Sequence, residues 1–372
     1  IEAALATYTQ CVALDSSVTT AIWKQAELTR QVEDDRAALP IYRHWLHARQ
    51  SIVDNNQWIG DLKSVAAIMP DSSGVLRDLT LALTEAGRPA EAQPYLESLC
   101  DILEAEGDFN AAANALESLI AHAAPPRAEK HLEAARLYEK GNASSLAQDH
   151  LRNAADILEH EGNIEQATAA MDKIIQIAGE NTLAEDYAYA ATLHARAANK
   201  SRARALIQQA LQTLSSQTGN RDRREKLLAQ AVSIDPLDPS FVIQHLEYLP
   251  AGRAMAEGMR AAEAMQAAGK HDDAIQILTQ VVALAPHDMS VRQQLFAPLR
   301  AAGNKMRLRQ ELMLLASDAL AAGDSDAAIE ALDEAETIAE TAQQFRALAE
   351  LNERARRLDE ATAQFVKAAT AF

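Results

Sequence analysis

The chain has 372 residues, of which 48% are hydrophobic and 24% are charged, a balance that allows a large core and argues against disorder. Its formal net charge of −18 would repel nucleic-acid phosphates and anionic lipid headgroups, so nucleic-acid binding is not expected. No apolar run approaches the roughly 18 residues of a membrane span, so we expect no direct membrane insertion of these residues.

The composition predicts an all-α protein. Aromatic residues make up only 4% of the chain, and the 13 Gly and 11 Pro residues separate long runs of helix-forming residues. Cys11 and Cys100 stand apart without CxxC spacing, which is typical of reduced thiols in a cytoplasmic protein rather than of a disulfide or zinc scaffold.

The first predicted helix covers Ile1–Leu14, and the chain does not open with Met. The last helix reaches Phe372 before its expected closing turn, so we expect a fragment of a longer protein, with a leader or anchor outside it left open. Between these ends, Asp101–Ala112 (DILEAEGDFNAA) recurs 55 positions later as Asp156–Ala167 (DILEHEGNIEQA). This recurrence predicts a repeated unit.

Two interleaved series of short polar turns mark this unit along the chain. The first series lies near residue 34 and at Gly87, Gly141, Asn199, Gly252, Gly303 and Arg357. The second series lies at Asn55, Gly107, Gly162, Gly219, Gly269 and Gly323. Successive turns within a series are 50 to 58 residues apart. This spacing predicts one continuous array over residues 1–372, with about six copies of a unit near 54 residues, which is typical of an α-solenoid.

Each unit is predicted to contain three helices. About 34 residues separate a second-series turn from the next first-series turn, and breaks at Pro125-Pro126, Asp235-Pro236 and Pro286 divide such segments into two helices. Only about 20 residues lead from a first-series turn to the next second-series turn, which is enough for one helix of roughly 17 residues.

The segment Lys270–Asp288 resembles the second helix of a tetratricopeptide repeat. It has the small residue Ala274, then Leu278 and Val281 on one face, and Pro286 at its exit. The same pattern recurs after the turn at residue 107, at Ala112, Leu116, Leu119 and Pro125. The resemblance implies a right-handed superhelix in which the small residue permits a close helix crossing.

The 20-residue spacing departs from the pattern of that family. Leu96 and Leu99 fit second-helix positions when counted from Gly87, and first-helix positions when counted back from Gly107. We therefore expect one helix to serve two overlapping repeats.

The resemblance also implies that a ligand binds the inner face, which first helices line. Carried over to this chain, the matching positions are Glu97, Asp101, Glu104, Asp149, Arg152, Asp156 and Glu159. This largely acidic row would suit a partner protein or peptide with a basic segment, and an ordinary solvated helix face is the alternative. The lysine and asparagine pair with which some members grip a C-terminal carboxylate is absent from these helices.

Two basic stretches interrupt the acidic chain on either side of one long predicted helix. They comprise Lys200, Arg202 and Arg204, followed by Arg221, Arg223, Arg224 and Lys226. We expect either one patch that binds an acidic partner or a second copy of the chain, or a solvated face paired locally with Asp222 and Glu225.

Motifs for catalysis are missing. Gly269-Lys270 is followed by His271 and lacks the glycine spacing of a phosphate loop, and neither GxGxxG nor HExxH occurs. His44 and His47 have no third ligand at a suitable spacing, so a structural or solvent role is expected. The sequence therefore predicts no catalytic residue, metal or cofactor.

The leading hypothesis is a non-enzymatic scaffold that binds another protein or its own copies within a larger bacterial assembly. The first unit holds Trp23, Trp45 and Trp58, for which we expect core packing, with a partner anchor as the alternative. The competing hypothesis is a sensor or regulatory arm attached to an effector domain outside these residues.

Overall fold

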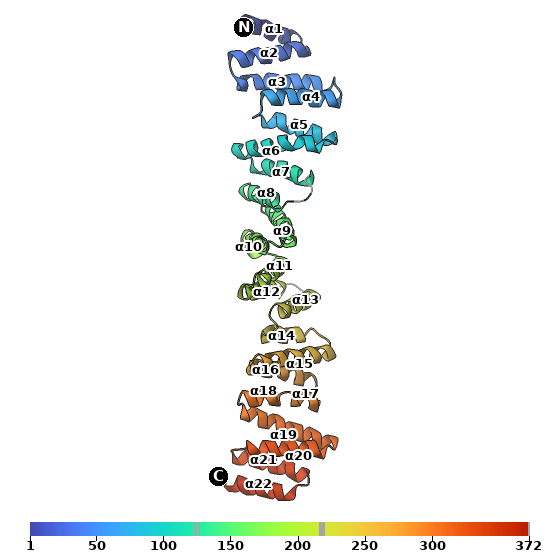
Figure 1. Cartoon of the computed structure of the whole chain (residues 1–372), viewed down its shortest axis with the longest axis vertical. Coiled ribbons are helices and arrows are strands. Elements are labelled where there is room, and N and C mark those ends of the chain that lie inside the picture. Colours follow the sequence, from blue (N-terminus) through green and yellow to red (C-terminus); the bar gives the residue numbers. More distant parts are fainter. Residues whose placement is uncertain (123–124, 126, 216–219, 371–372) are drawn as a thin grey trace. The chain divides into compact units, whose positions relative to one another are not determined.

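The structure is a computed structural model that describes residues 1–122, 125, 127–215 and 220–370 (Figure 1). These residues form α-helices joined by short connections, and the described part of the chain contains no strand. Helices contact chiefly their neighbours in sequence, which makes the fold an all-α solenoid. The chain divides into two compact units, an N-terminal unit (Ile1–Thr182) and a C-terminal unit (Leu183–Phe372).

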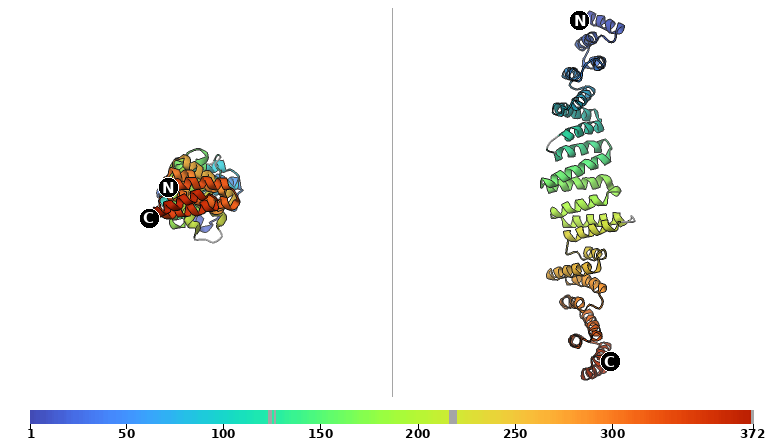
Figure 2. Two further views of the ribbon diagram at one scale, coloured as in Figure 1. Left: turned by 90° about the horizontal axis from the view of Figure 1, so that it is seen from below. Right: turned by 90° about the vertical axis from the view of Figure 1, so that its right-hand side faces the viewer.

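The N-terminal unit is a succession of helices in which each packs on the next. They are α1 (Glu2–Leu14), α2 (Thr19–Val32), α3 (Asp35–Gln50), α4 (Asn55–Ile68), α5 (Ser73–Glu85), α6 (Pro89–Glu106), α7 (Phe109–His122), α8 (Ala128–Lys140), α9 (Ser144–His160), α10 (Ile164–Ala178) and the short 3-10 helix η1 (Gly179–Asn181). In the turned view of Figure 2, α7 to α10 form successive layers.

The C-terminal unit continues the same pattern. Its helices are α11 (Ala184–Arg196), α12 (Lys200–Ser215), α13 (Arg221–Ile234), α14 (Pro239–Leu246), α15 (Ala251–Ala267), α16 (His271–Leu284), α17 (Met289–Gln293), α18 (Phe296–Ala301), α19 (Lys305–Ala322), α20 (Ser325–Thr337), α21 (Ala342–Arg354) and α22 (Leu358–Thr370). The break between α17 and α18 precedes Pro298, which has no N–H for the carbonyl of Gln294.

Glycine in the left-handed region closes many of the helices. Gly107 follows α6 with a φ of 81°, and the next N–H, that of Asp108, donates back to the carbonyl of Leu103 at 2.9 Å. Three equivalent turns use another residue, one position away from the predicted one. These are Asn142, Ala198 and Arg356, in place of Gly141, Asn199 and Arg357.

Two of the predicted turns lie inside helices. Asn55 is the first residue of α4, so the connection before that helix ends one position earlier, at Asp54. Gly252 is not a turn, because it lies in the first turn of α15, which begins directly after Pro250. The connection thus falls earlier, where proline cannot continue the preceding helix. Gly219 lies outside the described residues, as do Pro126 and Phe372.

The core consists of small residues at helix crossings and of aliphatic residues between them. Ala112 on α7 and Ala274 on α16 are fully buried, as the tetratricopeptide pattern predicts. Leu116, Leu278 and Val281 are buried beside them. These predicted core positions are therefore confirmed.

The close approach of α15 and α16 depends on Gly258. A Cβ at this position would overlap Cγ2 of Val281 and lie 3.2 Å from Cδ1 of Leu246. We expect Gly258→Ala to lower the free energy of unfolding by about 1 kcal/mol, because overpacking outweighs the gain in helix propensity. Urea denaturation followed by circular dichroism measures this effect.

Gly252 of the same helix provides the control, because nothing lies within 4 Å of a Cβ built there. Gly252→Ala should leave the stability unchanged or slightly raised. Equal effects of the two substitutions would contradict the packing argument.

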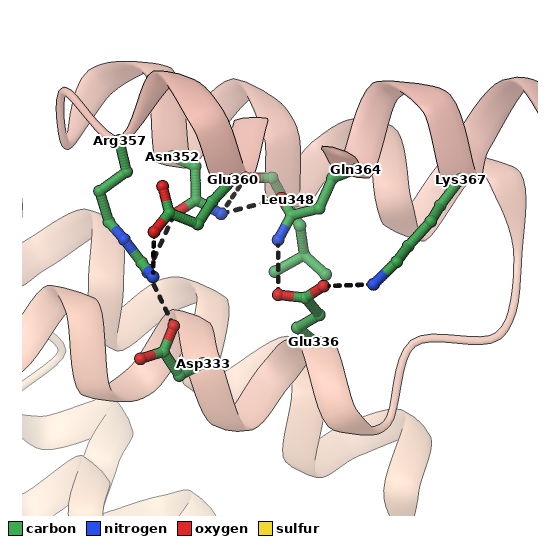
Figure 3. A network of polar contacts seen from close by, with 8 residues as sticks. All are labelled: Asp333, Glu336, Leu348, Asn352, Arg357, Glu360, Gln364 and Lys367. Carbon is green, nitrogen blue, oxygen red and sulfur yellow. Dashed lines mark hydrogen bonds and ion pairs between the residues drawn. The ribbon is translucent and has the colours of Figure 1, made fainter. Parts of the chain in front are cut away.

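Ion pairs connect helices that are two apart in sequence, within each unit. They are Lys63–Glu91, Arg136–Glu104, Lys173–Glu139, Arg300–Glu334 and Lys367–Glu336. Figure 3 shows the last of these beside a buried amide pair, in which Nδ2 of Asn352 donates to Oε1 of Gln364 at 2.8 Å. Gln364 in turn donates to Glu336 at 3.0 Å, so the polar groups between α20, α21 and α22 are mutually satisfied.

Candidate functional site

A hollow of about 560 Å³ lies between α3, α4 and α5. Its lining consists of Arg43, Leu46, His47, Gln50, Val53, Asn55, Trp58, Asp78, Leu81, Ala82 and Glu85. We call this surface the α3–α5 hollow. On α3 and on α5 its residues recur over seven positions, from 43 to 50 and from 78 to 85, so it extends about 10 Å along both helices.

Four charged or titratable side chains converge on this hollow. Arg43 and His47 come from α3, whereas Asp78 and Glu85 come from α5. Within the described ranges, the side chains of these four residues form no hydrogen bond or ion pair with another part of the chain. Their hydrogen-bonding capacity is therefore free for a ligand.

Because Gly74 has no side chain, the Arg43 guanidinium can lie close to the start of α5. A side chain at Gly74 would collide with Nη2 of Arg43, so the guanidinium lies directly against this first turn. Burial by the hollow walls raises the pKa of Asp78, and the nearby charges of Arg43 and Arg77 oppose that rise only in part.

Apolar groups occupy the middle of the hollow. Leu81 projects from α5 with 57% of its surface exposed, although Leu79 and Leu83 on either side are fully buried. Trp58 is half-buried at the start of α4, whereas Trp23 and Trp45 pack against each other with ring centroids 4.5 Å apart. Trp58 is thus the tryptophan placed for contact with a ligand.

A second hollow of about 490 Å³ lies between α5, α6 and α7 and also contains Leu81. The remaining lining is Arg77, Thr80, Thr84, Leu96, Leu99, Leu103, Asp108, Ala111, Asn114, Ala115 and Ser118. We call it the α5–α7 hollow. Because Leu81 lines both hollows, α5 forms a ridge between them.

The predicted acidic row on α6 has two different environments. Glu97 and Asp101 are exposed, and Glu97 accepts a hydrogen bond from Gln93 at 3.2 Å. Glu104 instead binds Arg136 at 2.6 Å and Lys140 at 2.9 Å. Hydrogen bonds from Arg136 and then Lys140 lower the pKa of Glu104 to about 2, so this carboxylate connects α6 to α8.

The predicted row on α9 is partly paired within its own helix. Asp149 accepts a hydrogen bond from Arg152 at 2.7 Å. Asp156 is exposed and Glu159 is half-buried on the same helix. Partner binding by these α6 and α9 residues stays a prediction.

The two predicted basic stretches do not form one patch, which excludes the first of the two alternatives given for them. Arg204 near the start of α12 pairs with Asp238, and Asp235 is 3.8 Å away, just beyond the end of α13. Arg221 and Arg223 begin α13, about 20 Å away along that helix. Antiparallel packing of consecutive helices places the two stretches at opposite ends.

Several of these basic residues contact their own chain. Arg221 lies over the ring of Tyr248, 5.6 Å from its centroid, and Arg223 is 3.5 Å from Glu185. Arg202 is exposed on α12, whereas Arg224 is half-buried on α13. Partner binding at these positions stays a prediction.

Two observations concern metal ligation and the buried Cys100 thiol in the described part of the chain. There, no group of three or more His, Cys, Asp or Glu side chains is placed to hold a metal ion. Burial raises the pKa of the Cys100 thiol to about 11, which makes it a poor nucleophile. No helix among the described residues has the length and apolar character needed to cross a membrane.

The sequence did not single out Arg43, Asp78, Leu81 and Glu85. Charged residues at seven-residue spacing are common on solvated helix faces, so their pattern predicts no site. Of these four residues, Leu81 is the one whose position in the sequence could have indicated a binding surface. It is a large apolar residue that lies outside the buried stripe of α5.

No protein-family model and no curated protein sequence matches the chain. Among solved structures, it is similar to a chain of Naa15/Naa10 bound to HypK-THB, at 13% identity and a TM-score of 0.31. That match covers 97% of this chain but only 64% of the other. At this TM-score the match supports no inference about function. The helical repeat array is instead identified from the helices of this chain.

Two further matches are to tetratricopeptide-repeat structures. The P58(IPK) TPR domain matches at 14% identity and a TM-score of 0.21, covering 86% of this chain and 98% of that one. The C-terminal part of a TPR repeat-containing protein from Cytophaga hutchinsonii matches at 14% identity and a TM-score of 0.23, covering 72% and 97%. At such scores the matches identify neither a partner nor a binding mode.

Proposed function

We propose that this chain is a non-enzymatic interaction scaffold that binds an extended segment of a partner protein in the α3–α5 hollow. The observation that carries the proposal is the combination of unpaired charged groups, Arg43, Asp78 and Glu85, with the exposed apolar surface of Leu81 and Trp58. Binding sites for polypeptides typically combine an apolar centre with a few placed polar groups.

The length of the hollow accommodates an extended segment. The hollow runs about 10 Å along α5, which matches about three residues of extended chain. The α5–α7 hollow lies on the other flank of the Leu81 ridge, so a longer segment that crosses Leu81 would enter it. A bound side chain would cover the leucine and remove its apolar surface from water.

A displayed library of random peptides tests this function with the purified full chain. We expect enriched peptides to lose about tenfold in affinity for Leu81→Glu, equivalent to about 1.4 kcal/mol, because a carboxylate replaces the apolar centre of the site. Fluorescence anisotropy of labelled peptides measures the affinities, and circular dichroism verifies that the variant is folded.

Leu146→Glu is the matched control, because Leu146 on α9 is 44% exposed and lies outside both hollows. It should leave peptide affinity unchanged. The proposal is overturned if the library yields no specific peptide, or if the enriched peptides bind Leu81→Glu as tightly as the unmodified chain.

A further inference from the structure

The charges at the two ends of α5 oppose the dipole of that helix. Arg43 places a cation against its first turn, at Gly74, where the helix dipole favours an anion. Glu85 is the last residue of α5, and the last turn contains no basic residue. A carboxylate there adds to the partial negative charge of the terminal carbonyl groups.

The two ends of the α3–α5 hollow therefore differ in charge. At the Gly74 end, Arg43 and Asp78 carry opposite charges on facing walls and largely offset each other. The other end holds Glu85, seven residues beyond Asp78 on α5, and the Glu85 side chain forms no ion pair with a described residue. His47 of α3 is the remaining titratable residue of the lining. The Glu85 end is thus a negative site whose carboxylate is not paired with a cation of the described residues.

The apolar centre lies at a fixed distance from this negative end. Leu81 precedes Glu85 by one helical turn, which is about 6 Å along α5. In an extended peptide, about 6 Å separates residues that are two positions apart, and their side chains point to the same face. One bound segment can therefore place two side chains on Leu81 and Glu85 together.

We propose that the bound partner segment carries Lys or Arg at the Glu85 end and an apolar residue about two positions away, against Leu81 and Trp58. This inference rests on the proposed function, because it assigns the chemistry of the segment that occupies the same hollow. The basic side chain forms a charge-assisted hydrogen bond with the Glu85 carboxylate and faces the terminal carbonyl groups of α5. Main-chain amides of the segment meet Arg43 and Asp78.

Exchange of the charge at residue 85 tests the inference. Separate selections from the same peptide library use the unmodified chain, Glu85→Lys and Glu165→Lys. Glu165 is an exposed acid on α10, outside the hollow, so its variant carries the same change in net charge. We expect Lys or Arg at a constant offset from an apolar position in peptides selected by the unmodified chain and by Glu165→Lys.

Glu85→Lys should select Asp or Glu at that offset and should bind the original peptides about tenfold more weakly. Peptide binding to the unmodified chain should also weaken between 50 mM and 500 mM salt, because salt screens the exposed pair. Peptides that depend on Leu81 but show no basic position, or no exchange with Glu85→Lys, would overturn this inference and leave the proposed function standing. Loss of Leu81 dependence overturns both.

Discussion

Glu311→Leu is expected to destabilise the C-terminal unit by about 3 kcal/mol, because it leaves a buried guanidinium without its main carboxylate. The Arg292 side chain is only 8% exposed, and its Nη1 donates to Oε2 of Glu311 at 2.7 Å. In this variant, Nη2 of Arg292 keeps Asp318 at 3.4 Å and the carbonyl of Pro286 as partners. The expected loss of stability therefore lies at the lower end of the range for buried ion pairs that lose one partner.

The double variant Arg292→Met with Glu311→Leu separates the charge from the packing. It removes both buried charges together, so we expect its stability to return to within about 1 kcal/mol of the unmodified chain. Glu350→Leu breaks the exposed Arg346–Glu350 pair and should cost about 0–1 kcal/mol.

Urea denaturation gives these differences, and hydrogen exchange should locate the loss of protection in α16 to α19. Helical repeat arrays can unfold locally, so the exchange measurement is needed beside the global transition. A double variant as unstable as the single one would contradict the account based on an unpaired charge.

Acid is expected to destabilise the N-terminal unit through a buried histidine pair. Nδ1 of His131 on α8 lies 3.0 Å from Nδ1 of His150 on α9, and both residues are 8% exposed. Nε2 of His150 lies 3.0 Å from Oε1 of Glu117 on α7, and the ring of Tyr138 stacks on the His150 imidazole. This cluster therefore joins three consecutive helices.

The hydrogen bond between the two imidazoles requires one Nδ1 with a proton and one without, so it cannot form when both rings are charged. The pKa of His131 is lowered below its ordinary value of 6.5. Burial is the larger cause, and repulsion from His150 is the smaller one. The unfolded chain then binds more protons as the pH falls below 6.5. Stability is thus full above about pH 6.5 and is lost below it, by at most about 1.4 kcal/mol per pH unit for this group.

Urea midpoints at pH 7.5 and pH 5.5 measure this effect, with tryptophan fluorescence as the probe of the N-terminal unit, which contains Trp23, Trp45 and Trp58. His131→Gln should be less stable than the unmodified chain at pH 7.5 but should lose less stability on acidification. His287→Gln, at a histidine whose side chain is 89% exposed, should retain the full loss. An unchanged loss in His131→Gln would rule out the histidine pair as its origin.

Local sequence determined the helices and most of the turns, because helix formation and left-handed turns depend on neighbouring residues. Gly107 and Gly323 are turns, as predicted, and the structure gives both a positive φ. The segment between Gly87 and Gly107 forms one long helix, also as predicted. The apolar spacing also placed Ala274, Leu278 and Val281 in the core. Departures occur where the signal is weak, as at Asn142, where a non-glycine residue adopts the left-handed conformation.

The tertiary structure alone decided which polar side chains meet. Glu104 and Glu85 are both acidic residues on helices, yet the first is held by Arg136 and Lys140, whereas the second lines a hollow and forms no ion pair with a described residue. Their environments depend on residues about 30 or more positions away, and on the helix face that packs against the next helix. Periodicity predicts that a face is buried, but the neighbours across it follow from the angle and register of packing, which a local pattern does not contain.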